Sequence, residues 1–410
     1  MSGCEKRYFL GIDTSNYTTS AAAVDEDGRI IAFSKRLLPV RAGGAGLRQS
    51  EAVFSHVRQL PGVMDELASQ IRAQYKPDDK VYGGAEYGAE DITGSEAKDR
   101  VDSESEGRFD SEAKDRVDSE SEGRFGSEAK GRVDSESEGR FGSEASEAKD
   151  SPGIKADRGE LRPAAVGYSA RPRDAEGSYM PCFLVGESTA LSLSSVCGVP
   201  AYDFSHQSGH LAAAVYGCGE EKLKSEPFYA FHVSGGTTEI LDVGCDGKIT
   251  LLGGTKDISA GQLIDRVGVM LGMHFPCGPE LERAAAEYSE AGGELSSVPA
   301  VCVRGPYCNL SGLENKLSGL KNSGRPMGEI ALYAITAVWL TLEKLTLEIF
   351  RAYGTRPVLY AGGVMSCAYI KERLGSRFDA YFAPPELSSD NAAGAAILCR
   401  KKYLSENGVI

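Results

Sequence analysis

Several common features are missing from this chain of 410 residues. Its ten cysteines are scattered without any C-x-x-C spacing. No apolar stretch approaches the roughly 18 residues that a membrane-spanning helix needs. Residues 1–7 run into an expected strand with no apolar segment of signal-peptide length. We therefore expect a cytoplasmic protein without a membrane segment.

Positive charge and histidine are also scarce. The net charge of −14 argues against a broad basic surface for nucleic acid, although a local basic groove would satisfy phosphate equally well. Only five histidines occur. With 41% hydrophobic residues, the chain can bury one large core or two lobes.

The segment between residues 95 and 150 differs in composition from the rest. A 16-residue unit recurs three times, as SEAKDRVDSESEGRFD, SEAKDRVDSESEGRFG and SEAKGRVDSESEGRFG, and the segment carries 18 acidic against 10 basic residues, hence a net charge of −8. Each unit has one Val and one Phe, which is too little apolar surface to offset the entropy lost on ordering. We predict a disordered, acidic repeat insert at residues 78–160.

Outside the insert, one pattern occurs twice. A buried strand, a polar turn rich in Gly, Ser and Thr, a second strand and an Asp-Gly turn follow one another in each half of the chain. Exposed backbone N–H groups and hydroxyls in such a turn can surround phosphate oxygens. Two ordinary hairpins would give the same pattern, but its recurrence favours a duplicated α/β architecture. The strand, turn and strand occupy 8–15, 16–19 and 20–24 in the first half, and 228–233, 234–237 and 238–243 in the second.

Two histidines, His206 and His210, are four residues apart at an expected helix start. This spacing puts both imidazoles on one face of a helix, where one divalent metal can bind both. A chance pair at a helix start is the alternative. The spacing offers no such partner to His56, His232 or His274, and these are expected to be structural.

Taken together, the motifs resemble those of the universal tRNA threonylcarbamoyltransferase family, from residue 8 to about residue 400 and skipping only the insert. The resemblance implies the duplicated two-lobe α/β fold of actin, Hsp70 and the sugar kinases (ASKHA fold). The lobes would comprise residues 1–77 plus 161–225 and residues 226–410. The matching motifs are Gly11-Ile12-Asp13-Thr14-Ser15, His206-x-x-x-His210, Val233-Ser234-Gly235-Gly236, Asp265 with Pro276-x-Gly278, Ser311-Gly312-Leu313, Gly362-Gly363-Val364 and Asp390-Asn391-Ala392.

The resemblance also implies an activity. Members transfer a threonylcarbamoyl group from threonylcarbamoyl-adenylate, an adenylate-type nucleotide substrate, to N6 of adenosine 37 in tRNAs that read codons beginning with A. A separate enzyme supplies the donor, and family helper proteins can take part. The expected partners are thus tRNA, the donor and these helpers, with no membrane.

Site residues follow position by position from the resemblance. His206, His210 and Asp390 match the metal ligands, a two-histidine, one-carboxylate set that suits iron(II), although ligand type also permits zinc. From the residues alone, Asp390 is equally an N-cap of the helix that follows. The substrate-binding positions are His232, Val233, Ser234, Gly235, Gly236, Asp265, Gly278 and Cys367.

The chain also departs from the family pattern. Asn16-Tyr17-Thr18 stands where the family has Cys-Asp-Glu, and Asp13, a candidate catalytic residue, replaces a Glu. Cys367 replaces an Asn that contacts substrate. Features for metal and phosphate persist while acid-base features do not, as in a divergent paralogue with another acceptor or a regulatory role.

Two other functions fit less well. A zinc peptidase of the common type needs H-E-x-x-H, and here Gln207, Ser208 and Gly209 separate the histidines, so no glutamate is placed as general base. A sugar or acetate kinase of the same fold needs no histidine pair.

Overall fold

The structure is a computed structural model, and it describes residues 7–15, 17–39, 47–74, 162–388 and 392–409. All of them belong to one compact unit, formed by Met1–Pro77 and Arg158–Ile410. The predicted insert and Asp390 lie outside the described residues.

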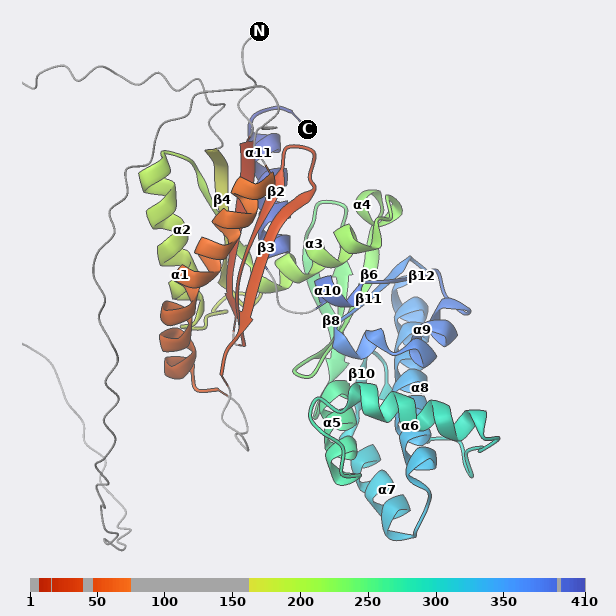
Figure 1. Ribbon diagram of the computed structural model, residues 1–410. Coiled ribbons are helices and arrows are strands. Elements are labelled where there is room, and N and C mark those ends of the chain that lie inside the picture. The colour runs from red at the N-terminus through yellow and green to blue at the C-terminus, as the bar shows by residue number, and fades with distance from the viewer. Residues whose placement is uncertain (1–6, 16, 40–46, 75–161, 389–391, 410) are drawn as a thin grey trace, which may run out of the picture. The chain divides into compact units, whose positions relative to one another are not determined.

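Two sheets with the same strand order organise this unit (Figure 1). In the first sheet, three antiparallel strands run in the order β3-β2-β1, and β4 and β5 follow in parallel beside β1. The second sheet repeats this as β8-β7-β6, with β11 and β12 in parallel beside β6. The first sheet consists of β1 (Arg7–Ser15), β2 (Thr18–Asp25), β3 (Ile30–Leu37), β4 (Arg162–Arg171) and β5 (Ala201–Ser205). The second consists of β6 (Phe228–Val233), β7 (Thr238–Val243), β8 (Ile249–Thr255), β9 (Cys302–Arg304), β10 (Tyr307–Asn309), β11 (Val358–Ala361) and β12 (Ala380–Phe382).

The repeated order confirms the duplicated two-lobe α/β fold of the actin, Hsp70 and sugar-kinase type. The predicted strands of both meanders are present: those of the first half lie within two residues of their expected ends, and those of the second half have the expected bounds. Each polar turn joins the first two strands of its sheet, as the sequence pattern indicates.

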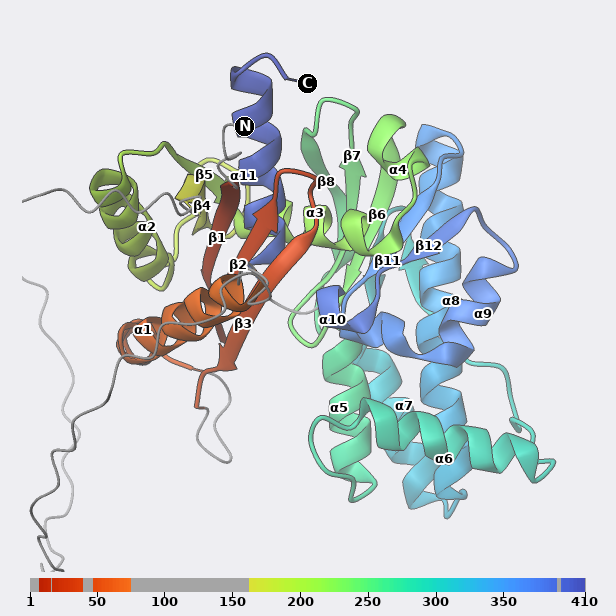
Figure 2. The ribbon, with the colours of Figure 1, turned by 45° about the horizontal axis from the view of Figure 1, so that its top comes forward.

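Helical layers cover both faces of the first sheet (Figure 2), and alternation along β1 distributes its side chains between them. Leu10 and Ile12 pack with α1 and α2, while Phe9 and Gly11 face the C-terminal helix α11. A Cβ at Gly11 would lie 2.4 Å from the Ala392 carbonyl oxygen, so the close packing of α11 requires glycine there. The helices are α1 (Gln49–Gln74), α2 (Phe183–Cys197) and α11 (Ala393–Glu406).

The second sheet is likewise covered on both faces. Tyr229, Phe231 and Val233 of β6 pack into the core that includes α5 and α8, whereas Phe228 and Ala230 face α3 and α4. Alternation therefore places His232 on the face that α3 covers. The covering helices are α3 (His206–Cys218), α4 (Lys222–Ser225), α5 (Ala260–Met270), α6 (Gly278–Glu290), α7 (Ser311–Asn322), α8 (Met327–Tyr353), η1 (Gly363–Ser366), α9 (Ala368–Gly375) and α10 (Pro385–Ser388).

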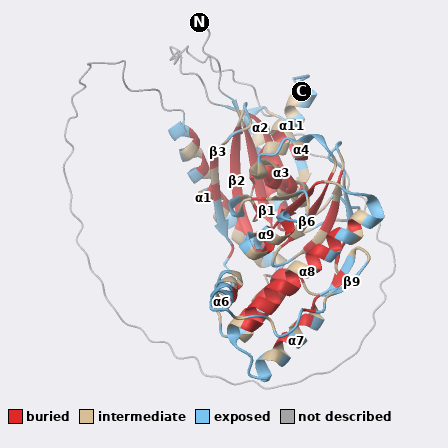
Figure 3. Ribbon diagram, turned by 90° about the vertical axis from the view of Figure 1, so that its right-hand side faces the viewer, coloured by how far each residue is buried: buried red, intermediate tan, exposed pale blue. Residues whose placement is uncertain are grey.

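Helix α8 is the central helix of this second core (Figure 3). By length and composition alone it could cross a membrane, but most of it is buried against the protein. It also carries two buried glutamates, Glu329 and Glu343, which pair with Arg325 and Arg377. These are the properties of a core helix.

The last helix, α11, lies within the predicted C-terminal lobe but packs on the first sheet. It also crosses α3 closely, since a Cβ at Gly394 would lie 1.8 Å from the Gly209 carbonyl oxygen. The helix begins at Ala393 with Ala392 at the N-cap position. Asp390 lies outside the described residues, so a capping role for its side chain stays a prediction.

Candidate functional site

Strand β5 leads directly into the helix that carries the histidine pair. Ser205 is extended and caps α3, and its Oγ accepts a hydrogen bond from the Ser208 backbone N–H at 3.0 Å. His206 is therefore the first residue of the helix, and His210 follows one turn later. Their Nε2 atoms lie 2.9 Å apart, which confirms that the two imidazoles share one face.

A buried carboxylate from the first sheet orients this pair. Asp13, on β1, is fully buried, and its Oδ1 lies 2.8 Å from His206 Nδ1. A carboxylate at Nδ1 leaves Nε2, on the opposite side of the ring, to face His210. Asp13 thus contacts His206, a predicted metal ligand, and its side chain is not exposed in the site.

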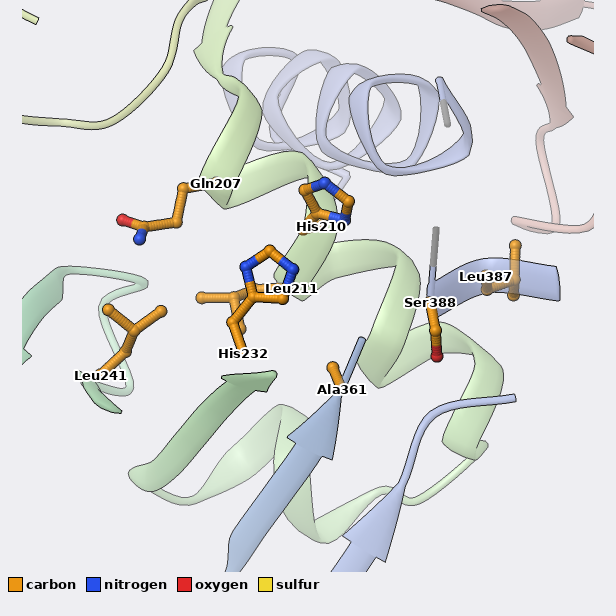
Figure 4. Close-up of a pocket in the computed structure, with 8 residues that line it drawn as sticks. All are labelled: Gln207, His210, Leu211, His232, Leu241, Ala361, Leu387 and Ser388. Carbon is orange, nitrogen blue, oxygen red and sulfur yellow. The ribbon is translucent and has the colours of Figure 1, made fainter. Parts of the chain in front are cut away.

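His232 approaches the pair from the second sheet. Its ring centroid lies 4.9 Å from that of His210, so His232 has a histidine neighbour that the sequence spacing did not indicate. Both rings line a small pocket with a volume of about 10 Å³, close to the space that one water needs (Figure 4). The pocket is lined by Gln207, His210, Leu211, His232, Leu241, Ala361, Leu387 and Ser388.

The separation of the two imidazole nitrogens fits a shared metal ion. Two nitrogens each about 2.1 Å from a metal and at right angles to one another would be about 3 Å apart. The observed 2.9 Å between His206 Nε2 and His210 Nε2 is close to that value. The third predicted ligand, Asp390, is not among the described residues, and within the described ranges no group of three His, Cys, Asp or Glu side chains could hold a metal.

The predicted phosphate loop is fastened to the start of α5. Ser259 Oγ donates to the Gly235 carbonyl at 2.8 Å, and the Gly261 N–H donates to the Ser234 carbonyl at 3.2 Å. A Cβ placed on Gly235 or on Gly236 would meet no atom of the described residues within 4 Å. Both α-carbons therefore face open space, where a ligand could approach the main chain closely.

Asp265 and Gly278 are brought together, although they are 13 residues apart in sequence. Asp265 Oδ1 accepts a hydrogen bond from the Cys277 backbone N–H at 2.9 Å, next to Gly278 at the start of α6. Burial raises the pKa of Asp265, against the opposing effect of the Cys277 N–H. Within the described residues its hydrogen bond goes to Oδ1, and the second oxygen of a carboxylate can accept from a further donor such as a ribose hydroxyl.

Cys367 lies at the N-cap position of α9, where Glu282 accepts a hydrogen bond from the adjacent Ala368 N–H at 2.7 Å. Burial raises the pKa of the Cys367 thiol to about 12, so it remains protonated at neutral pH. Upstream, Gly362 has φ +103°, and a Cβ there would lie 2.3 Å from the Val233 carbonyl oxygen. This close approach joins the two strand ends that border the site.

Three polar side chains beside the histidines were not predicted as part of the site: Glu239, Gln207 and Arg173. Glu239 lies directly across from His232 in the β6–β7 pairing, and its Oε2 accepts a hydrogen bond from Gln207 Nε2 at 3.2 Å. Its Oε1 pairs with the guanidinium of Arg173. The four-residue turn between the predicted strands already implied that His232 and Glu239 share one face, and this was the available signal.

Comparison with known proteins identifies one family over the second half of the chain. The family model described as tRNA N6-adenosine threonylcarbamoyltransferase matches residues 168–397, which is more than half of the sequence. A protein of that name from Thermus thermophilus is 34% identical over 221 residues, which cover 54% of this chain and 66% of the relative. One from Streptococcus thermophilus is 28% identical over 241 residues, covering 54% and 68%. The chain thus spans slightly less than two thirds of the Thermus relative.

A solved structure is similar at a lower level. The activator of the 2-hydroxyisocaproyl-CoA dehydratase from Clostridium difficile has a TM-score of 0.44 and 11% sequence identity over 98% of both chains. The fold is therefore assigned from the strand order of the two sheets.

Proposed function

The chain belongs to the tRNA N6-adenosine threonylcarbamoyltransferase family, and on that premise we propose that it transfers a threonylcarbamoyl group from threonylcarbamoyl-adenylate to N6 of adenosine 37 in tRNAs that read codons beginning with A. One observation in the structure carries the proposal. The paired Nε2 atoms of His206 and His210 converge beside a loop whose glycines face open space.

In this transfer, a bond forms between N6 of adenosine and the carbamoyl carbon. The bond from that carbon to the phosphate oxygen breaks, AMP leaves, and the attacking amine loses a proton. His206 and His210, with Asp390 as a third ligand, would hold one divalent metal, iron(II) or zinc, which supplies a Lewis acid toward donor oxygens. Asp13 fixes the ring of His206 so that Nε2 faces the shared position.

The donor's nucleotide would lie along the second sheet's end of the site. The main chain of Ser234, Gly235 and Gly236 would approach the phosphate, since nothing occupies the space over the two glycines. Asp265, beside Gly278, would accept from a ribose hydroxyl. The high pKa of Cys367 supports a contact role rather than a nucleophilic one.

The expected surroundings of the reaction are part of the proposal. tRNA is the acceptor, and family helper proteins could assist. All nine cysteines among the described residues are free thiols, which supports a reducing cytoplasm.

The test is direct. Purified protein is incubated with threonylcarbamoyl-adenylate and unmodified tRNA, with and without the family's helper proteins, and the digested nucleosides are analysed by mass spectrometry. We expect the threonylcarbamoyl form of adenosine to accumulate. Its absence under both conditions would reject tRNA as the acceptor.

The altered Asn16-Tyr17-Thr18 segment favours a second candidate, a divergent paralogue that binds metal and nucleotide with another acceptor or a regulatory role. This candidate predicts nucleotide binding by calorimetry without transfer to tRNA. Accumulation of the modified adenosine would reject it.

A further inference from the structure

The first turn of α3, which begins with His206 and leads into His210, is held from two sides. On one side, the loop after β4 contacts it, since Asp174 Oδ2 accepts from the hydroxyls of Ser205 and Ser208 at 2.9 and 2.6 Å. The Gln207 backbone N–H also donates to the Pro172 carbonyl at 3.0 Å. On the other side, the side chain of Gln207 donates to Glu239 of β7.

Glu239 connects these two sides. Its carboxylate binds Arg173 through Oε1 and Gln207 through Oε2, so a single side chain joins the loop, the strand and the helix. The Glu239 side chain is only 14% exposed, whereas that of Arg173 is 42% exposed. The acidic residues that the family has after the first Thr-Ser are replaced in this chain. Glu239 is an acidic residue close to the histidines, and it belongs to none of the family motifs named above.

We propose that Glu239, clamped by Arg173, is a positioning residue that fixes the histidine-bearing turn of α3 through Gln207. The role toward the metal rests on the proposed function, whereas the ordering of the turn does not. Glu239 acts on His206 and His210 only through the helix that carries them. The raised pKa of Glu239, caused by burial and opposed by Arg173 and Gln207, agrees with a carboxylate that is enclosed by its partners.

The chemistry of the carboxylate explains why an amide would not replace it. Both oxygens of Glu239 accept, one from each partner, whereas a glutamine has a single acceptor oxygen and an NH₂ group. In Glu239→Gln, the remaining oxygen accepts from Arg173 without a negative charge, and Gln207 keeps a hydrogen bond only if its own amide turns to present its oxygen. The substitution changes the volume little but weakens both connections, because the charge that holds the two partners is lost.

The strand offers a matched control. Asp242, three residues along β7, pairs with Arg356 at 2.7 Å, and its side chain is 27% exposed. Asp242→Asn breaks an ion pair of the same kind on the same strand, without contact to α3. Arg173→Met breaks the same ion pair at its more exposed residue. This variant still tests the proposal if Glu239→Gln folds poorly.

The first measurement is hydrogen exchange of the metal-free full chain, followed in peptides that cover residues 205–211. We expect Glu239→Gln and Arg173→Met to speed exchange there about fivefold, the effect of losing one net hydrogen bond. Asp242→Asn should leave these peptides unchanged. Equal exchange in all four proteins, or the same acceleration in Asp242→Asn, would overturn the proposal.

The second measurement is Co²⁺ titration of the same proteins, followed by absorption. Glu239→Gln should weaken Co²⁺ binding about tenfold, at the low end of effects seen for outer-shell partners, and the Arg173→Met/Glu239→Gln double variant should bind no more weakly. Wild-type affinity in Glu239→Gln would overturn the metal part of the proposal. If the wild-type protein binds no Co²⁺, the metal site of the proposed function fails, while the exchange measurement still decides the role of Glu239.

Discussion

The two meanders occupy the same position in their sheets, yet their first strands supply different groups to the site. β1 contributes Asp13, which is fully buried and bonded to His206. β6 contributes His232, which lines a pocket and is followed by a loop with two open glycines. The duplicated fold therefore holds the histidines rigidly from one sheet and leaves room for a ligand at the other.

The largest expected effect comes from the histidines between the two sheets. His206→Asn or His210→Asn removes a proposed ligand and should weaken Co²⁺ binding by more than about 100-fold, beyond the range typical of outer-shell changes. Titration followed by absorption measures this. His274→Asn is the control, since the side chain of His274 is 93% exposed and lies on another segment. If both His206→Asn and His210→Asn still bind Co²⁺ tightly, the two histidines are not the metal ligands.

The contribution of the first sheet is tested by Asp13→Asn. The amide keeps the shape of the side chain but loses the charge that holds His206 Nδ1–H, so Co²⁺ affinity should fall about 10- to 100-fold. Asp25→Asn, at the far end of β2, is the matched control. Unchanged affinity in Asp13→Asn would show that the first sheet does not orient the histidine.

The contribution of the second sheet is tested by Gly235→Ala. Because a Cβ there meets no atom in the part of the chain that the structure describes, the variant should melt at the wild-type temperature. It should nevertheless bind AMP about tenfold more weakly in calorimetry, a loss of about 1.4 kcal/mol, because the methyl group occupies the space proposed for the phosphate.

Gly312→Ala is the control for this change, since that position is equally open but begins α7. If AMP binds equally well to both variants and to the wild type, the phosphate lies elsewhere.

The smallest effect concerns Asp257, which joins β8 to the start of α7. Burial alone would raise the pKa of this carboxyl, but hydrogen bonds from Leu310, Ser311 and Asn309 lower it well below its usual range. A folded-state pKa below the unfolded value means that the stabilisation is present above the unfolded pKa of about 3.8 and is lost as the pH falls through the folded value.

Asp257→Asn should therefore reduce the free energy of unfolding by about 1 kcal/mol at pH 7, since the group is largely exposed. The difference from the wild type should shrink in urea titrations toward pH 2. If the difference in the free energy of unfolding does not change with pH, the charge of Asp257 is not the cause, and the hydrogen bonds stabilise the fold equally in the protonated and the ionised form.

Much of the fold followed from the sequence because its signals are local. Alternating strands and Gly-rich turns predicted both meanders, and the four-residue spacing predicted the shared face of His206 and His210. The contact between His232 and His210 joins a strand and a helix that lie apart in the chain, so spacing alone could not indicate it.

The loop after β4 shows the same limit. Arg173 is 66 residues from Glu239, and in the sequence it looks like any solvated charge. Contacts of this kind depend on tertiary packing, which no local pattern encodes.

The central claim is that the two sheets together hold a divalent metal on α3. Anomalous diffraction at the cobalt edge, on crystals grown with Co²⁺, tests it most directly. We predict one strong peak within about 2.2 Å of both His206 Nε2 and His210 Nε2. A peak elsewhere, or no peak while the two nitrogens remain at hydrogen-bond distance, would contradict the claim.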